Sequence, residues 1–216
     1  MAVTAITRLP ELLVGFDTET TGLGVRSERA ISYGFAVYHY TRPVATEEFF
    51  VVPDRPIGEG ARRVHGLDLQ ALEARRAVAD VLTVAEGARR ALTLLRRYHE
   101  EGAFVVGANL TGFDLPMLRW TARDVLGGEE DFDPRSLRTI DVIDHELVVR
   151  RGEPARYRRS LTSLCRRYNV SPGGHDAVGD ARAAVEVLIA QVVANNAGQV
   201  ELPLNGPPTA AGGMVG

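Results

Sequence analysis

The sequence contains no lysine and only one cysteine among its 216 residues. A single cysteine, Cys165, excludes an internal disulfide, and a reducing cytoplasm is the simplest setting. The basic residues are all arginines, which suits bidentate phosphate contacts but also follows from a GC-rich coding bias. No apolar run approaches the roughly 20 residues of a membrane span, and the first residues lack the pattern of a secretion signal. We therefore expect a cytoplasmic protein with no membrane partner.

An excess of positive charge is missing as well. The formal net charge is -3 and the sequence pI is about 6.0. A protein that holds nucleic acid by charge alone is usually basic. Any contact with nucleic acid should therefore be short, or depend on a metal ion or a partner. The hydrophobic content of 45% and the charged content of 25% are typical of a globular protein that is large enough for a substantial core.

The order of apolar segments predicts a single α/β domain. Three strands are expected first, at 12–16, 30–40 and 48–52. Helices and short strands then alternate, with a helix over 80–100, a strand at 103–107, a helix over 113–125, a strand or helix entry at 139–142, and helices over 161–168 and 176–195. This order predicts a mixed sheet flanked by helices. We expect a domain over 1–196 and a flexible C-terminal tail over 197–216, where Pro, Gly and Ala dominate.

Two carboxylates stand two residues apart at the end of the first expected strand. Asp17 and Glu19 should point to the same side, because strand side chains alternate. Neighbouring carboxylates raise each other's pKa, and a divalent cation removes that cost. The alternative is a solvated edge strand with two exposed acids. The apolar residues at 12–16 argue against it, since acids at the tip of a buried strand need a partner.

Further acids and a histidine follow at similar places. Asp114 begins a helix after the 103–107 strand, so it should lie near the C-terminal edge of the sheet. A first-turn acid stabilised by the helix dipole is its structural alternative. His175 lies in or beside a loop that follows Ser-Pro-Gly-Gly, and Asp180 lies about one turn into the last helix. A surface histidine and a first-turn acid are the alternatives there.

Together, three stretches indicate a family. Residues 16–23 (FDTETTGL), 108–114 (ANLTGFD) and 175–181 (HDAVGDA) resemble, in order and spacing, the three motifs of the DEDDh 3′–5′ exonucleases. That family includes the epsilon proofreading subunit of bacterial DNA polymerase III, ribonuclease T and oligoribonuclease. The resemblance covers about 11–190. It implies a ribonuclease H-like α/β fold, with a five-stranded mixed sheet flanked by helices.

The resemblance also implies roles for the five residues. Asp17, Glu19, Asp114 and Asp180 would bind two divalent ions, Mg²⁺ or Mn²⁺, and His175 would act as the general base. The implied reaction is hydrolysis of the terminal phosphodiester of single-stranded DNA by a two-metal mechanism, which releases 5′-mononucleotides.

The second motif departs from the commonest pattern of the epsilon-like members. Three residues separate Asn109 from Phe113, where many of those members have two. Ala108 stands where a histidine is frequent. These departures put the role of Asn109 in doubt and leave that of Asp114 in place.

Substrate contacts are implied at six further positions. Leu23 would wedge against the terminal base, backbone groups of Thr20 or Thr21 would lie near the 3′ end, and His65 would line the nucleotide pocket. Phe113 would pack beneath the sugar or base. Asn109 is the sixth expected substrate contact. His65 at a helix end and Phe113 in the core are the structural alternatives. Trp120 and Cys165 are expected in the core.

Two regions outside the motifs suggest binding surfaces. Arg158 and Arg159 belong to an arginine-rich stretch that is either a track for phosphates or a solvated face. The peptide at 199–204 (QVELPL) resembles sliding-clamp peptides through Gln199, Leu202 and Leu204, and a plain helix-end segment is its alternative.

The expected partner is the 3′ end of a nucleic acid, with single-stranded DNA favoured, and a sliding clamp or DNA polymerase is a further expected partner. A ribonuclease T-like or oligoribonuclease-like 3′–5′ exoribonuclease is the nearest alternative function. An inactive nuclease-fold interaction module is an alternative of another class. Degenerate members usually lose acids, whereas all five positions are present here, which argues against the module.

Overall fold

A six-stranded mixed sheet forms the centre of the computed structural model, which describes residues 6–76, 81–127, 132–150 and 160–198. The strand order is β4-β3-β2-β1-β5-β6. β1 pairs antiparallel with β2 and parallel with β5. The strands are β1 (Leu12–Thr20), β2 (Ala30–His39), β3 (Arg42–Val52), β4 (Val81–Thr83), β5 (Phe104–Gly107) and β6 (Thr139–Asp141). The expected α/β class is confirmed, with one strand more than the five expected.

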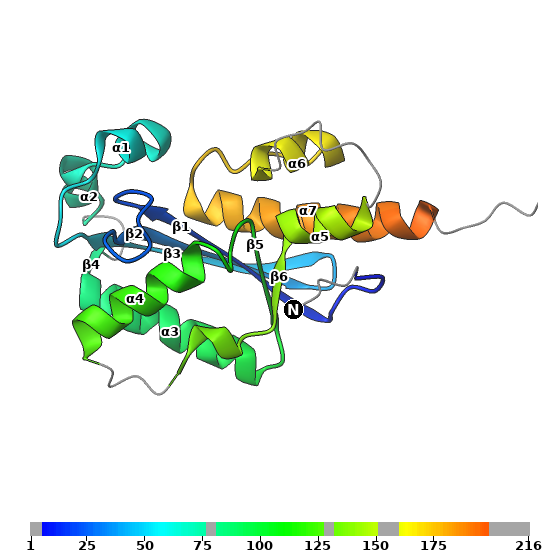
Figure 1. The fold of residues 1–216 in the computed structure, drawn as a ribbon, viewed down its shortest axis with the longest axis horizontal. Helices are drawn as coiled ribbons and strands as arrows, with labels where there is room; N and C mark the ends of the chain where they lie inside the picture. Colours follow the sequence, from blue (N-terminus) through cyan, green and yellow to red (C-terminus); the bar gives the residue numbers. More distant parts are fainter. Residues whose placement is uncertain (1–5, 77–80, 128–131, 151–159, 199–216) are drawn as a thin grey trace, which may run out of the picture.

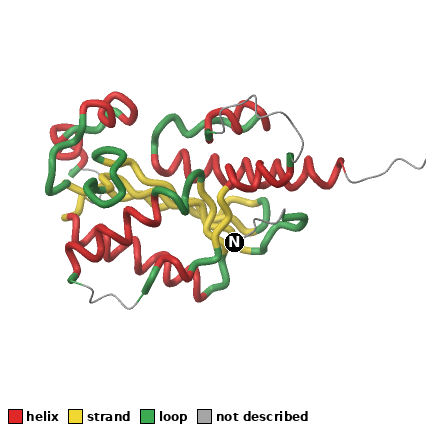
Figure 2. The backbone as a smooth tube through the Cα atoms, in the orientation of Figure 1, coloured by secondary structure: helices red, strands yellow, loops and turns green. Residues whose placement is uncertain are grey.

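Helices cover both faces of the sheet (Figure 1). α3 and α4 lie on one face, α5, α6 and α7 lie on the other, and α1 and α2 lie beside one end of the sheet. Figure 2 shows the same layers as helix and strand. The helices are α1 (Glu59–His65), α2 (Leu69–Arg75), α3 (Val84–Glu100), α4 (Asp114–Leu126), α5 (Val142–Val149), α6 (Leu161–Tyr168) and α7 (Ala177–Gly198), with a 3-10 turn at Pro134–Ser136.

The alternation of β1 side chains divides the core into two layers. Phe16 belongs to the layer under α3 and α4, and its ring centroid lies 5.0 Å from that of Phe35. Leu13 belongs to the other layer, with Val185 and Leu188 of α7. Odd-numbered β1 residues therefore face α7, and even-numbered ones face α3 and α4.

The predicted helix over 80–100 was wrong in its first residues. Val81–Thr83 forms β4, which pairs parallel with β3, and α3 begins only at Val84. The Thr83 side chain accepts a hydrogen bond from the backbone N–H of Glu86, whose carboxylate accepts one from the N–H of Thr83. This capping box fixes the start of the helix and separates it from the strand. The expected elements did not include α1 or α2, although the alternative for His65 put it at a helix end, and α1 does end at His65.

Two glycines let α7 lie unusually close to the sheet. A Cβ on Gly15 of β1 would lie 2.2 Å from the carbonyl oxygen of Ala181. A Cβ on Gly34 of β2 would lie 2.1 Å from the carbonyl carbon of Ala177. Only glycine permits these contacts without displacement. They place the first turn of α7, which carries Asp180, over the C-terminal end of β1.

Some expectations concern residues outside the described ranges. Arg158 and Arg159 lie there, as does the 199–204 peptide with Gln199, Leu202 and Leu204, so their roles stay predictions. The expected tail falls almost entirely in the same part of the chain. Within the described residues, no helix is both long and apolar enough to cross a membrane.

Candidate active site

The two acids of β1 lie on the face that α7 covers. Glu19 is only 8% exposed, and burial together with the charges of Asp180 and Asp114 raises its pKa to about 8. Asp17 is half-buried by area. Burial first, and then the carboxylates of Asp114, Asp180, Glu19 and Asp176, raise its pKa well above the ordinary value. Every charge that acts strongly on Asp17 is therefore negative.

Asp114 reaches the cluster from the opposite side of β1. It begins α4, is 3% exposed, and accepts a hydrogen bond of 2.6 Å at Oδ1 from the Thr18 hydroxyl. Burial raises the pKa of Asp114 to about 7, although the hydrogen bond from Thr18 acts in the lowering direction. Thr18 was missed by the sequence interpretation. The sequence could have indicated this role, because Thr18 lies between Asp17 and Glu19 on a strand. Strand alternation therefore turns its side chain to the other face, where α4 lies.

His175 and Asp180 complete the cluster from the entry of α7. Gly174 and His175 have φ angles of 78° and 63°, so two consecutive left-handed residues turn the chain before the helix. Nδ1 of His175 lies 3.9 Å from Oδ2 of Asp180, and the imidazole is 54% exposed. One ligand atom each from Glu19, His175 and Asp180 lies within 4.8 Å of the others. The structure thus brings all five motif residues to one end of the sheet.

The chemistry of this donor set fits a divalent cation. Hard cations take carboxylate oxygens as ligands, and burying several carboxylates together is costly without a counter-charge. The pKa values of Asp17, Glu19, Asp114 and Asp180 are all raised, as that cost requires. A bound cation would offset it by stabilising the ionised forms.

His65 also reaches this end of the sheet. Its Nε2 lies 3.1 Å from the carbonyl oxygen of Thr20, and its Nδ1 accepts a hydrogen bond from the backbone N–H of Leu67. These contacts place the ring proton on Nε2. Burial lowers the pKa of His65, and the charge of His175 acts in the same direction. The histidine ring is therefore held against the end of β1, near the loop that carries His175.

The turn after β1 presents one large apolar side chain. Leu23 is 89% exposed. Thr21 is buried, with its hydroxyl donating to Glu28 and its N–H donating to the carbonyl of Arg29. The Thr20 hydroxyl donates to the carbonyl of Gly22. Both threonine side chains thus hold the turn that carries Leu23 outward.

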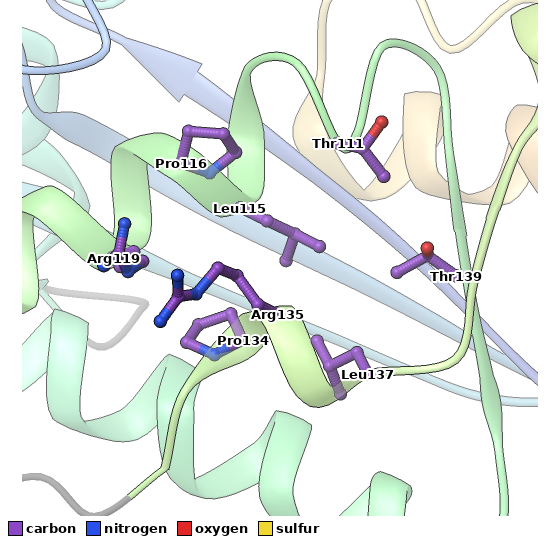
Figure 3. Close-up of a pocket in the computed structure, with 8 residues that line it drawn as sticks. All are labelled: Thr111, Leu115, Pro116, Arg119, Pro134, Arg135, Leu137 and Thr139. Atoms are coloured by element: carbon purple, nitrogen blue, oxygen red, sulfur yellow. The ribbon is translucent and has the colours of Figure 1, made fainter. Parts of the chain in front are cut away.

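The loop before α4 places the last two expected residues. Asn109 is exposed, has a φ of 61°, and donates its N–H to Oδ1 of Asp141. Phe113 is half-buried at the N-cap of α4. A cavity of about 300 Å³ adjoins this loop on the side away from α7 (Figure 3), lined by Thr111, Leu115, Pro116, Arg119, Pro134, Arg135, Leu137 and Thr139.

Solved structures with the same fold include exonuclease I of E. coli. Its zinc-bound complex with single-stranded DNA matches with a TM-score of 0.66 and 20% identity, over 85% of this chain and 40% of that chain. Its complex with a dT13 oligonucleotide matches with a TM-score of 0.64 and 18% identity, over 85% and 41%. This chain thus spans about two fifths of the length of exonuclease I. The match confirms the ribonuclease H-like architecture.

A family model settles the membership that the motifs suggested. A search of curated proteins finds no match. The RNase_T model, described as an exonuclease family, matches residues 14–188, which extend from β1 into α7. Since that match covers most of the chain, the protein belongs to the RNase T family of exonucleases.

Proposed function

We propose that the chain is a 3′–5′ exonuclease that removes 5′-mononucleotides from single-stranded DNA with the help of two divalent ions, Mg²⁺ or Mn²⁺. One observation carries the proposal: four carboxylates and an imidazole from three distant segments converge at the C-terminal end of β1. Asp17, Glu19, Asp114 and Asp180 would hold the ions. When bound, the ions supply charge neutralisation and a water of lowered pKa.

The remaining chemistry belongs to side chains of the chain itself. His175 is the proton acceptor, because its imidazole is exposed to solvent, lies beside Asp180, and sits on a turn that can approach a substrate. Thr18 positions Asp114 through its buried hydrogen bond. Asp17 would help to hold both ions, since the charges of Asp114, Asp180 and Glu19 all act on it.

The substrate end is assigned to groups around the turn after β1. Leu23 projects into solvent beside the acids and would wedge against the terminal base. His65 would line the nucleotide pocket, with its Nε2 proton held by Thr20. Phe113 and Asn109 would lie on the opposite side, before α4. The preference for single-stranded DNA is supported by the fold shared with exonuclease I, whose structures contain single-stranded DNA.

The direct test is digestion of a single-stranded DNA oligonucleotide labelled at its 5′ end. Mg²⁺ or Mn²⁺ should give a ladder that shortens from the 3′ end, and EDTA should abolish it. A 3′ label should be released as the mononucleotide. An RNA oligomer of the same sequence should be cut more slowly, and faster cutting of RNA would favour the exoribonuclease alternative. An intact oligonucleotide under every metal condition would favour the inactive interaction module.

A role in proofreading or repair, with a clamp or polymerase as partner, is a finer proposal. It is supported by the likeness of the 199–204 peptide to clamp-binding peptides, through Gln199, Leu202 and Leu204. Pull-down with a bacterial sliding clamp should succeed with the full chain and fail after deletion of 199–204. Failure with the full chain would remove the clamp from the proposal and leave the nuclease activity untouched.

A further inference from the structure

Three arginines surround the single tryptophan of the chain on the outer side of α4. The guanidinium carbons of Arg26, Arg123 and Arg119 lie 4.6, 5.3 and 5.7 Å from the ring centroid of Trp120. Trp120 is half-buried, so the expectation that it belongs to the core was only partly right. We call these four residues the arginine–tryptophan cluster. Cation–π contacts hold the guanidinium groups together despite their like charge.

Two of these arginines present their side chains to solvent. Arg26 and Arg123 are exposed. Within the described part of the chain, neither has a carboxylate at ion-pair distance. Asp124, the neighbour of Arg123, pairs instead with Arg29 at 3.0 Å. In a chain with a net charge of -3, the described residues here form a local concentration of positive charge.

The cluster lies beside the path to the candidate active site. Arg26 belongs to the turn that presents Leu23, and the Arg29–Asp124 ion pair fastens that turn to α4. The N-terminus of the same helix carries Asp114. A strand whose last nucleotide meets the carboxylates and Leu23 can therefore continue across the outer side of α4.

Arg119 extends the cluster into the cavity beside the 109–113 loop. Its side chain contacts the Trp120 ring and also lines the cavity, where Arg135 faces it across the opening (Figure 3). Arg119 and Arg135 share Asp133, so they are partly neutralised. Leu115, Pro116, Pro134 and Leu137 make the walls apolar. About 300 Å³ is at the lower end of small-molecule pockets and suits one ring system.

We infer that the arginine–tryptophan cluster binds the phosphates of a single-stranded nucleic acid upstream of its terminal nucleotide, and that the adjoining cavity takes one unstacked base. This inference rests on the proposed function and adds to it the route of the strand. Guanidinium groups bind phosphate in a bidentate manner, and apolar walls with arginine at the rim accept a base. The cluster thereby supplies a positive contact for the strand in a chain whose net charge is -3.

A charge-reversal pair with a matched control tests the inference. The test variant carries Arg26→Glu and Arg123→Glu. The control carries Arg8→Glu and Arg42→Glu, at two exposed arginines beside the opposite end of β1. Each replacement changes the charge by -2, so both variants move the formal net charge from -3 to -7. Circular dichroism establishes that each variant is folded, and Arg26→Ala with Arg123→Ala replaces a test variant that is not.

Two measurements distinguish binding of the upstream strand from hydrolysis at the terminal nucleotide. Binding of a fluorescent oligothymidylate is followed by anisotropy in Ca²⁺ at several salt concentrations. Turnover is followed with the p-nitrophenyl ester of thymidine 5′-monophosphate, which occupies only the terminal site. We expect the test variant to bind the oligonucleotide about tenfold or more weakly, because two charged contacts are lost. Its salt slope should flatten by about 1.4, while turnover of the ester stays unchanged.

Each other outcome has a definite meaning. Wild-type affinity and salt slope in the test variant would overturn the inference, and so would equal weakening in the control, since net charge alone would then explain the loss. If the wild-type chain hydrolyses neither ester nor oligonucleotide, the proposed function fails. The binding measurement still decides, in that case, whether the cluster holds a strand.

Discussion

A methyl group added at Gly15 should separate α7 from the sheet and displace Asp180. In Gly15→Ala the new Cβ would lie 2.2 Å from the carbonyl oxygen of Ala181, whereas ordinary van der Waals contact begins near 3.4 Å. The obstacle is helix backbone, so α7 must move by roughly 1 Å. Overpacking of this kind costs about 1–3 kcal/mol of unfolding free energy. A shift of about 1 Å at a catalytic carboxylate lowers kcat by roughly 100-fold.

Urea unfolding and steady-state hydrolysis of a single-stranded oligonucleotide measure the two effects. The control is Gly60→Ala in α1, where the new Cβ meets nothing within 4 Å. That variant should keep its activity and gain up to about 1 kcal/mol of stability, because alanine favours a helix over glycine. A Gly15→Ala protein with wild-type stability and kcat would refute the argument that this close contact positions Asp180.

Three further predictions concern the carboxylate cluster. In EDTA the thermal stability should fall as the pH rises from about 5 to 9, because the pKa of Glu19 is raised from 4.5 to about 8 and that of Asp114 from 3.8 to about 7. Deprotonation of each group then opposes folding by an amount on the order of 4 kcal/mol. Added Mg²⁺ should restore the melting temperature most at high pH, and a pH-independent melting curve would contradict this. Thr18→Val removes the hydroxyl that holds Asp114, so kcat should drop and chemical denaturation should show a loss of about 1–3 kcal/mol, whereas Thr18→Ser should keep most of both. Asp17→Ala and His175→Ala should abolish turnover and leave circular dichroism spectra like those of the wild type, since neither side chain belongs to the packed apolar core. Retained turnover would remove their proposed roles.

The sequence predicted the fold where periodicity and composition were strong. The strands at β1, β2 and β5 and the long helices α3, α4 and α7 follow from apolar patterns that local sequence displays. β4 was missed because three residues are too few to show the alternation of a strand. Its apolar residues also fit the helical spacing of the segment that follows, so they were assigned to that helix. α1 and α2 were missed because each is seven residues long, and α1 buries none of its side chains. Without an apolar face, a short helix leaves no periodic signal.

The acids of the site were predictable because each stands at the end of a recognisable element. The supporting contacts were not, since they join residues distant in sequence. The Thr18–Asp114 hydrogen bond spans 96 positions, and the His65–Thr20 contact spans 45. The place of Trp120 depended on Arg26 of a separate turn. Contacts of this kind depend on how β1, α1 and α4 are packed, which periodicity alone does not specify.

The carboxylate cluster is complete only when α7 has packed on the sheet, so a partly folded chain should lack activity. Asp180 and His175 belong to the last described segment, whereas Asp17 and Glu19 are made much earlier in synthesis. A nascent polypeptide that has not yet docked this helix lacks Asp180, one of the four proposed ion ligands, and His175, the proposed base, and it exposes Gly15 and Gly34 to water. The proposed nuclease activity should therefore arise only when folding is complete, so that unfinished chains do not cut nucleic acid.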